Sequence, residues 1–213
     1  MARDEERRAR SAEQPVVGGL PEVPGIVVAM RLAPGLSEHL KGLADALLVE
    51  PFPGSTLSRG ERELIATAVS AGNDCFYCMD SHGAFASELL RREEAAGGAT
   101  GGATGIETLI DGIKSGRSDG TTPRLAALLD LARTVQRNAR AVTADDVGCA
   151  TAAGASDGDV QLTVLIASAF CMYNRMVDGL RARTPPSAEA YRDRAAQIAE
   201  HGYSDPRVQS LPR

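Results

Sequence analysis

The chain has 213 residues, of which 43% are hydrophobic, 24% charged and 4% aromatic, and it contains no tryptophan. This length predicts one soluble, globular domain with a core of Ala, Leu, Val and Ile. A formal net charge of −5 offers no basic surface for nucleic acid, and no uninterrupted apolar run reaches the roughly 18 residues that span a bilayer, so we expect neither partner.

Residues 1–24 predict a flexible N-terminal tail. Met1–Gln14 is rich in Arg, Glu and Asp, and no apolar stretch follows it. A secretory signal needs such a stretch and a transit peptide avoids acidic residues, so we expect a cytoplasmic protein. In a reducing compartment, a close cysteine pair more often serves catalysis or metal binding than a structural disulfide.

Helix signals recur along the chain and strand signals hardly appear. Apolar residues at helical spacing predict a helix over 36–48, which the Pro51–Gly54 segment ends. Ser58 and Glu61 have the spacing of a capping box, which begins a second helix that we expect to run to about residue 71.

A turn at residues 72–74 separates this helix from the next, which carries two cysteines. Asn73 or Asp74 in this turn has the side chain to cap that helix. The Gly-rich segment 97–105 then predicts a loop without packing capacity.

The second half of the chain continues the helical pattern. Thr122 followed by a proline predicts a capped helix, and Thr143 and Ser156 each precede an aspartate by three residues. The helix after Ser156 is apolar nearly all round until Tyr173, so we expect it at the centre or in an oligomer interface. A last helix is expected over 187–201. The predicted class is all-α, an antiparallel helical bundle.

The most informative group of residues is Cys75 and Cys78, followed by His82 and preceded by Glu63. If residues 75–90 are helical, the two cysteines and the histidine lie on one face. Two thiols three residues apart can form a reversible disulfide, and a thiolate beside a base is a strong nucleophile. The pattern therefore indicates redox chemistry.

A peroxide is cleaved when a thiolate attacks one oxygen, and the sulfenic acid so formed condenses with a second thiol. His82, one turn beyond Cys78, can take the proton of that thiol, and Glu63 can orient His82 or pass a proton onward. Cys78 is then the attacking thiol. Cys75, nearer the turn, is expected to resolve the sulfenic acid and to meet the external reductant.

Other readings of the cysteine pair stay open. A zinc site would use the same Cys and His ligands but lacks a fourth ligand nearby. Two inert buried thiols beside a surface histidine are a further alternative. A thioredoxin-like motif needs a βαβ context, and a haem-attachment motif needs histidine where Met79 stands. We expect no metal and no cofactor.

Several other polar or reactive residues have weaker signals. Cys149 and Cys171 have no neighbouring Cys or His and are expected in the core. Asn174, Arg175 and Asp178 form a polar cluster at the end of the apolar helix, as a buried cap or an interface pair.

Glu63, Cys75-x-x-Cys78 and His82 together resemble the alkylhydroperoxidase D-like branch of the carboxymuconolactone decarboxylase superfamily. Residues 57–65 through Ser81-His82 look like its core motif, and Asn174-Arg175 with Asp178-Gly179 looks like the end of its second core helix. The likeness covers roughly residues 25–182, which defines the expected helical domain. Residues 183–213 are left as a C-terminal helix and tail.

The resemblance implies an all-α homo-oligomer, commonly a trimer or hexamer, with peroxidase activity. It implies that Cys78 attacks the peroxide, Cys75 resolves, and Glu63 and His82 relay protons. A dithiol or a lipoylated protein is the implied reductant. Some members have histidine where this chain has Tyr77, and a phenol that titrates near 10 cannot act as a base at neutral pH. The implied relay is therefore shorter here.

Two other functions remain as alternatives. A lactone decarboxylase of the same superfamily would not need the cysteine pair, so the presence of both thiols argues against that lyase. A non-enzymatic thiol sensor or partner-binding protein could use the same dithiol, and peroxide turnover with a dithiol reductant would separate enzyme from sensor.

Overall fold

The computed structural model of the chain describes residues 34–97 and 105–208, and before them positions 5, 6, 9, 15, 16, 25, 26 and 30. These residues form eight α-helices and two 3₁₀ helices and include no strand, which confirms the all-α class. Most of the tail predicted at residues 1–24, and most of the loop predicted at 97–105, lie outside the described residues.

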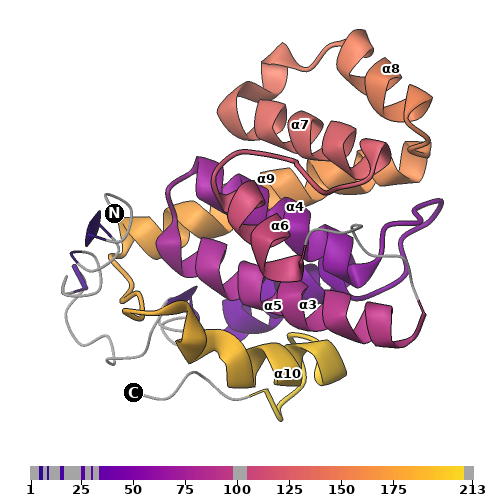
Figure 1. Cartoon of the computed structure of the whole chain (residues 1–213). Coiled ribbons are helices and arrows are strands. Elements are labelled where there is room, and N and C mark those ends of the chain that lie inside the picture. Colours follow the sequence, from indigo (N-terminus) through magenta and orange to yellow (C-terminus); the bar gives the residue numbers. More distant parts are fainter. Residues whose placement is uncertain are drawn as a thin grey trace.

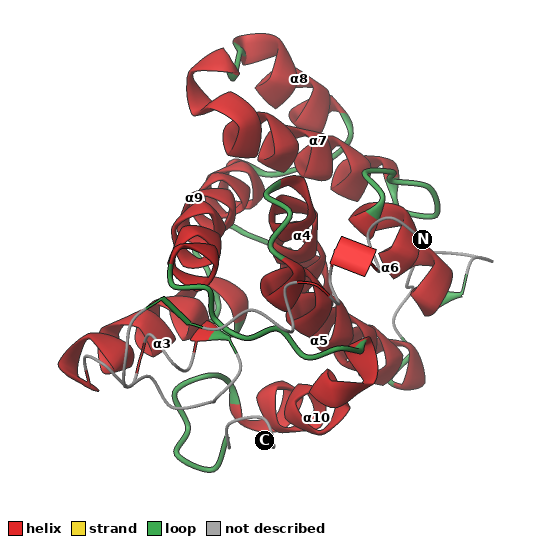
Figure 2. Cartoon of the chain, turned by 90° about the vertical axis from the view of Figure 1, so that its left-hand side faces the viewer, coloured by secondary structure: helices red, strands yellow, loops and turns green. Residues whose placement is uncertain are grey.

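The helices are, in chain order, α3 (Pro34–Leu48), α4 (Arg59–Gly72), α5 (Phe76–Ala95), α6 (Ile106–Lys114), α7 (Pro123–Asn138), η1 (Ala139–Ala141), α8 (Ala144–Ala152), α9 (Asp157–Gly179), η2 (Ala188–Tyr191) and α10 (Arg192–His201). Helix α4 is central, because it contacts α3, α5, α6, α7 and α9. Figures 1 and 2 show α7 and α8 at one end of the molecule and α10 at the other, against α5.

The predicted capping signals are confirmed at four helices. Ser58 begins α4 in a complete capping box with Glu61, Thr143 begins α8 in the same way, and Ser156 begins α9. Thr122 accepts a hydrogen bond from the third residue of α7, after the proline at its first position. Each cap satisfies backbone N–H groups that a helix start leaves without partners, typically worth about 1 kcal/mol.

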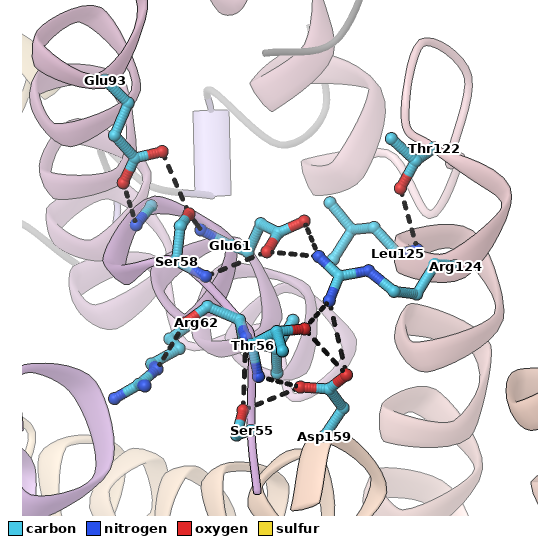
Figure 3. A network of polar contacts seen from close by, with 12 residues as sticks. Ser55, Thr56, Ser58, Glu61, Arg62, Glu93, Thr122, Arg124, Leu125 and Asp159 are labelled. Carbon is cyan, nitrogen blue, oxygen red and sulfur yellow. Dashed lines mark hydrogen bonds and ion pairs between the residues drawn. The ribbon is translucent and has the colours of Figure 1, made fainter. Parts of the chain in front are cut away.

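One arginine joins the starts of α4, α7 and α9, as Figure 3 shows. The Arg124 guanidinium donates to both carboxylate oxygens of Glu61, at 2.7 and 2.8 Å, and lies 3.4 Å from Asp159 Oδ2. Asp159 Oδ1 also accepts from the Ser55 hydroxyl at 2.8 Å and the Thr56 N–H at 2.7 Å. This network fixes the loop before α4 and thereby sets where α4 begins.

The start of the cysteine helix differs from the prediction. Helix α5 begins at Phe76, so Cys75 is its N-cap residue and not part of its first turn, and no side-chain capping hydrogen bond forms there. Asn73 ends α4 instead, and Asp74 takes a left-handed backbone conformation with φ of 53°. Aspartate tolerates that conformation better than most residues, which allows the tight reversal between the two helices.

Helix α9 ends at Gly179, directly after the predicted polar cluster of Asn174, Arg175 and Asp178, and packs against α4 and α7. It is central on one side only, because Leu165 is 45% exposed and Met172 is 38% exposed. Among the described helices, α9 is long and apolar enough to cross a membrane by length and composition alone. Half of its most apolar part is buried within the protein, and core helices of globular proteins pass the same test.

The last predicted helix is present in two pieces, η2 and α10, joined directly at Tyr191 and Arg192. Both pieces contact α5, so the C-terminal segment lies over the helix that carries the cysteines. Tyr191 is fully buried there. The segment after residue 183 is therefore packed onto the bundle and covers part of it.

Candidate functional site

A short turn places the two helices of the candidate site side by side. The N–H of Cys75 donates to the Ser70 carbonyl at 3.0 Å, and the N–H of Asp74 donates to the Ala71 carbonyl at 3.2 Å. These bonds satisfy the last carbonyls of α4 and fold α5 back onto it. The residues of α4 therefore face those of α5.

The polar cluster at the end of α9 holds this turn. Asn174 is buried, and its Nδ2 donates to Ser70 Oγ at 3.1 Å, while its Oδ1 accepts from Asn73 Nδ2 at 2.8 Å. Gln136 of α7 donates to Asn73 Oδ1 at 2.8 Å. Asn174 thus connects α9 to the turn as a buried polar residue, in line with the predicted buried cap. Arg175 is exposed.

Glu63 and His82 meet between α4 and α5. Glu63 Oε2 lies 2.6 Å from His82 Nδ1, and the exposed fraction of their side chains is 1% and 13%. With Nδ1 bonded to the carboxylate, Nε2 is the ring nitrogen that can accept a proton. Packing against Phe170, with ring centroids 4.5 Å apart, and against Phe85, at 5.2 Å, fixes the imidazole.

Tyr203 completes this pair and was not among the predicted site residues. Its hydroxyl donates to Glu63 Oε1 at 2.5 Å and lies 3.4 Å from His82 Nδ1. Tyr203 follows α10 and is 140 residues from Glu63, so no local sequence pattern connects the two. Only the glycine before it, which ends α10, signalled a turn at this position.

The two cysteines are unequal. Both are free thiols, and their exposed fractions are 0% for Cys75 and 2% for Cys78. A hydrogen bond to Cys78 and then burial hold the pKa of the Cys75 thiol well above its ordinary value, and the charges of Cys78 and Asp178 act in the same direction. Cys75 therefore keeps its proton at neutral pH and can donate it to the Cys78 sulfur.

A small cavity of about 60 Å³ lies over Cys78 and His82. Tyr203 lines it too, whereas Cys75 is not among the described lining residues. Two cationic side chains, Lys41 and Arg194, share its otherwise largely apolar wall. A space of this size holds a few water-sized molecules.

The burial of Cys75 corrects the expectation that it meets the external reductant from the exposed turn. Although Asp74 beside it is exposed, Cys75 packs in a closed cluster with Val177, Ala182 and Tyr191. Val177 lies on α9, Ala182 follows that helix and Tyr191 ends η2, so the cover comes from residues more than one hundred positions beyond Cys75, and the sequence around the cysteine pair carries no sign of it. The thiol that lines the cavity is Cys78.

Tyr77 lies buried between Tyr191 and Gly25. Its ring makes an edge-on contact with Tyr191 at 5.6 Å, and a Cβ on Gly25 would lie 1.8 Å from its Cζ. Burial raises the pKa of Tyr77 to about 12, although Arg194 opposes the shift. The phenol is thus no base at neutral pH.

The remaining cysteines are not core residues, contrary to the prediction. Cys149 is exposed on α8 and Cys171 is half-buried on α9. No group of three or more His, Cys, Asp or Glu side chains within residues 34–97 and 105–208 is arranged to hold a metal ion. A larger hollow of about 610 Å³ on the opposite face of α5 is lined by charged side chains that include the Lys114–Asp80 pair, and it contains neither cysteine of the pair.

Comparison with known proteins relates this geometry to a family. The model of the carboxymuconolactone decarboxylase family matches residues 34–100, which hold Glu63, Cys75, Cys78 and His82. No curated protein matches the chain.

Two solved structures share the fold. The alkylhydroperoxidase AhpD core of an uncharacterized peroxidase-related protein from Ralstonia eutropha JMP134 is 25% identical, with 76% of this chain and 77% of that one aligned and a TM-score of 0.63. An uncharacterized peroxidase-related protein from Silicibacter sp. TM1040 is 23% identical, with 85% and 93% aligned and a TM-score of 0.64.

Proposed function

Because residues 34–100 match the model of the carboxymuconolactone decarboxylase family, we propose that the chain is a thiol-dependent peroxidase of the alkylhydroperoxidase D-like type. The observation that carries the proposal is the shared cavity of Cys78 and His82, with His82 bonded to Glu63 behind it. A nucleophile, Cys78, and a base, His82, thus line the same small cavity, and the carboxylate of Glu63 orients the base.

In the proposed cycle, Cys78 loses its proton to His82 Nε2 and the thiolate attacks one peroxide oxygen. The S–O bond forms, the O–O bond breaks, and the departing oxygen takes the proton from His82 to leave as an alcohol or water. Glu63 stabilises the imidazolium between the two transfers.

The sulfenic acid on Cys78 is then attacked by Cys75, and water leaves as the disulfide forms. Cys75 must first lose its own proton, which its raised pKa opposes, so resolution is expected to be slower than attack. A dithiol, free or on a lipoylated protein, supplies the two electrons that restore the thiols.

The cavity over Cys78 has room for a small peroxide. Its space of about 60 Å³ holds a few water-sized molecules, which is enough for hydrogen peroxide. Hydrogen peroxide is therefore the expected first substrate to assay.

The test is consumption of hydrogen peroxide with dithiothreitol as reductant. Cys78→Ser is expected to abolish consumption, and Cys75→Ser to permit one turnover and leave a sulfenic acid on Cys78 that dimedone traps. Cys149→Ser and Cys171→Ser are the matched controls, because neither thiol lines the cavity, and both should retain activity.

Two outcomes contradict parts of the proposal. A sulfenic acid on Cys75 in the Cys78→Ser variant, with none on Cys78 in the other, would reverse the roles. A wild-type protein that forms the disulfide once with peroxide but does not turn over would instead be a thiol sensor, and activity on a lactone without use of the thiols would make it a lyase.

A further inference from the structure

Tyr203 reaches the site from the far end of the chain, and two anchors hold the segment that carries it. Asp45 of α3 accepts the Tyr203 N–H at Oδ1, at 2.6 Å, and the Ser204 N–H at Oδ2, at 2.9 Å. Arg59 of α4 donates to the last carbonyls of α10, those of Ile198 at 2.9 Å and Ala199 at 2.8 Å. The main chain is thus fixed on both sides of Tyr203.

The turn between these anchors requires glycine. Gly202 has φ of 77° and ψ of −164°, a backbone conformation that residues with a Cβ rarely adopt. A Cβ at this position would also lie 2.8 Å from Asp45 Oδ1. Gly202 therefore lets the carboxylate of Asp45 approach the backbone and directs the next side chain inward.

The Tyr203 side chain directed inward in this way donates a hydrogen bond to the second carboxylate oxygen of Glu63. Oε2 of that carboxylate is bonded to His82 Nδ1, and Oε1 accepts the Tyr203 hydroxyl. The Tyr203 and His82 rings are stacked, with centroids 6.1 Å apart and planes 23° from parallel. A buried carboxylate oxygen without a donor would be costly, so the phenol favours the orientation of Glu63 in which one oxygen meets His82 and the other meets Tyr203.

We propose that Tyr203 is a positioning residue of the site: its hydroxyl holds the Glu63 carboxylate turned toward His82, so that His82 keeps its proton on Nδ1 and offers Nε2 to Cys78. The catalytic meaning of this role rests on the proposed peroxidase function, but its effect on Cys78 does not. The family match ends at residue 100, so this residue is supplied by a segment outside the matched region.

The surroundings of Tyr203 keep its hydroxyl protonated, so that it remains a hydrogen-bond donor to Glu63. Burial, and then the charge and hydrogen bond of Glu63, raise the pKa of Tyr203 well above its ordinary value, which outweighs the opposite effect of two arginines. The titratable and charged groups that face it are Glu63 and Arg59 on α4, His82 and Cys78 on α5, Lys41 and Asp45 on α3, and Arg194 on α10.

The experiment compares Tyr203→Phe with Tyr173→Phe. Tyr173 lines the same cavity, but its hydroxyl donates to the Leu40 carbonyl at 2.8 Å and not to Glu63, so it is the matched control. The rate of Cys78 alkylation by iodoacetamide is followed against pH by peptide mass spectrometry. The tautomer of His82 is followed by nitrogen-15 NMR, where the chain has only three histidines to assign.

Without the phenol, the Glu63–His82 pair should bind a proton more tightly, and a pair that already holds that proton cannot accept one from Cys78. The acid limb of the alkylation profile should therefore move to higher pH in Tyr203→Phe by about one to two units, the equivalent of one hydrogen bond to a charged group. The Nδ1–H form of His82 should lose population. Tyr173→Phe should change neither readout.

The proposal is overturned if the alkylation profile of Tyr203→Phe is that of the wild type, or if Tyr203→Phe and Tyr173→Phe shift it equally. Asp45→Ala provides a second test, because it frees the turn but keeps the phenol. We expect the alkylation profile to shift in the same direction by a smaller amount. The double variant should shift no further than Tyr203→Phe alone. If Tyr203→Phe does not fold, the presence or absence of the Asp45→Ala shift decides. If the alkylation profile shifts but the protein consumes no peroxide, the positioning role of Tyr203 stands and the proposed peroxidase function is rejected.

Discussion

His82 of α5 and Glu63 of α4 share a hydrogen bond of 2.6 Å that leaves one imidazole nitrogen directed away from the carboxylate. The histidine rests on Phe170 and Phe85, so its ring has little freedom to turn. A pair held in this way is suited to accept and return one proton beside Cys78, which lines the same cavity as the ring.

Loss of the base should slow the first chemical step. His82→Asn keeps a polar side chain but removes the titratable nitrogen, so we expect sulfenic acid formation on Cys78 to slow by roughly 10²–10⁴-fold. Glu63→Gln should act in the same direction. Stopped-flow kinetics in the Cys75→Ser background measures the rate, and exposed His39 gives the control His39→Asn. A rate unchanged in His82→Asn would remove the histidine from the mechanism.

The burial of Cys75 predicts an order of thiol modification. At pH 8 iodoacetamide should modify exposed Cys149 and cavity-lining Cys78 before Cys75, because Cys75 is buried and its raised pKa keeps it protonated. Peptide mass spectrometry after timed quenching gives the order. Denaturation should make the thiols react at similar rates, and faster labelling of Cys75 in the folded protein would contradict the structure.

Asp159 predicts acid sensitivity. Burial raises the pKa of this carboxyl, but hydrogen bonds from Ser156, Ser55 and Thr56 outweigh burial and hold it at about 2. Since an unfolded aspartate titrates near about 3.9, its contribution to stability is present above that pH and is lost as the pH falls to about 2.

The Asp159→Asn variant should therefore be less stable at pH 6 and lose less stability on acidification than the wild type. Urea titrations at several pH values measure the free energy of unfolding. Asp157→Asn, at an exposed neighbouring position, is the control. Parallel stability curves for Asp159→Asn and wild type between pH 4 and 2 would count against the assignment.

Two buried tyrosines predict alkaline sensitivity. Burial raises the pKa of both Tyr77 and Tyr173 to about 12, and an unfolded tyrosine titrates near about 10. The folded protein thus holds protons that the unfolded chain has lost. Between those pH values each tyrosine should reduce the free energy of unfolding by about 1.4 kcal/mol per pH unit. Tyr173→Phe should flatten this slope when measured by urea titration, and an unchanged slope would refute the cause.

The exposed face of α9 predicts self-association. Leu165 and Met172 are seven residues apart, so they lie on the same face of a helix whose other side is in the core. We propose that a second copy of the chain covers them. Sedimentation velocity at micromolar concentration should show an oligomer, which Leu165→Glu reduces to smaller species. Ala196→Glu, at an exposed position on α10, should not, and a wild-type monomer would reject the interface.

The helices were predictable because their signals are local. Ser58 with Glu61, and Thr122 with the proline after it, satisfy the first N–H groups of their own helices, so the spacing alone marks each start. The start of α5 was misjudged by one residue because the reversal before it depends on the left-handed conformation of Asp74 and on bonds to Ser70. Neither of these appears in a pattern of residue types.

The sequence by itself determined the all-α class and the grouping of Glu63, Cys75, Cys78 and His82, because these residues lie on two consecutive helices joined by a short turn. Only the tertiary structure decided which thiol lines the cavity and what completes the acid–base pair. The cover over Cys75 comes from Val177, Ala182 and Tyr191, and the hydroxyl at Glu63 comes from Tyr203. All of them are more than one hundred residues further along the chain. Contacts at that separation depend on how the helices pack, and packing is not encoded in local spacing.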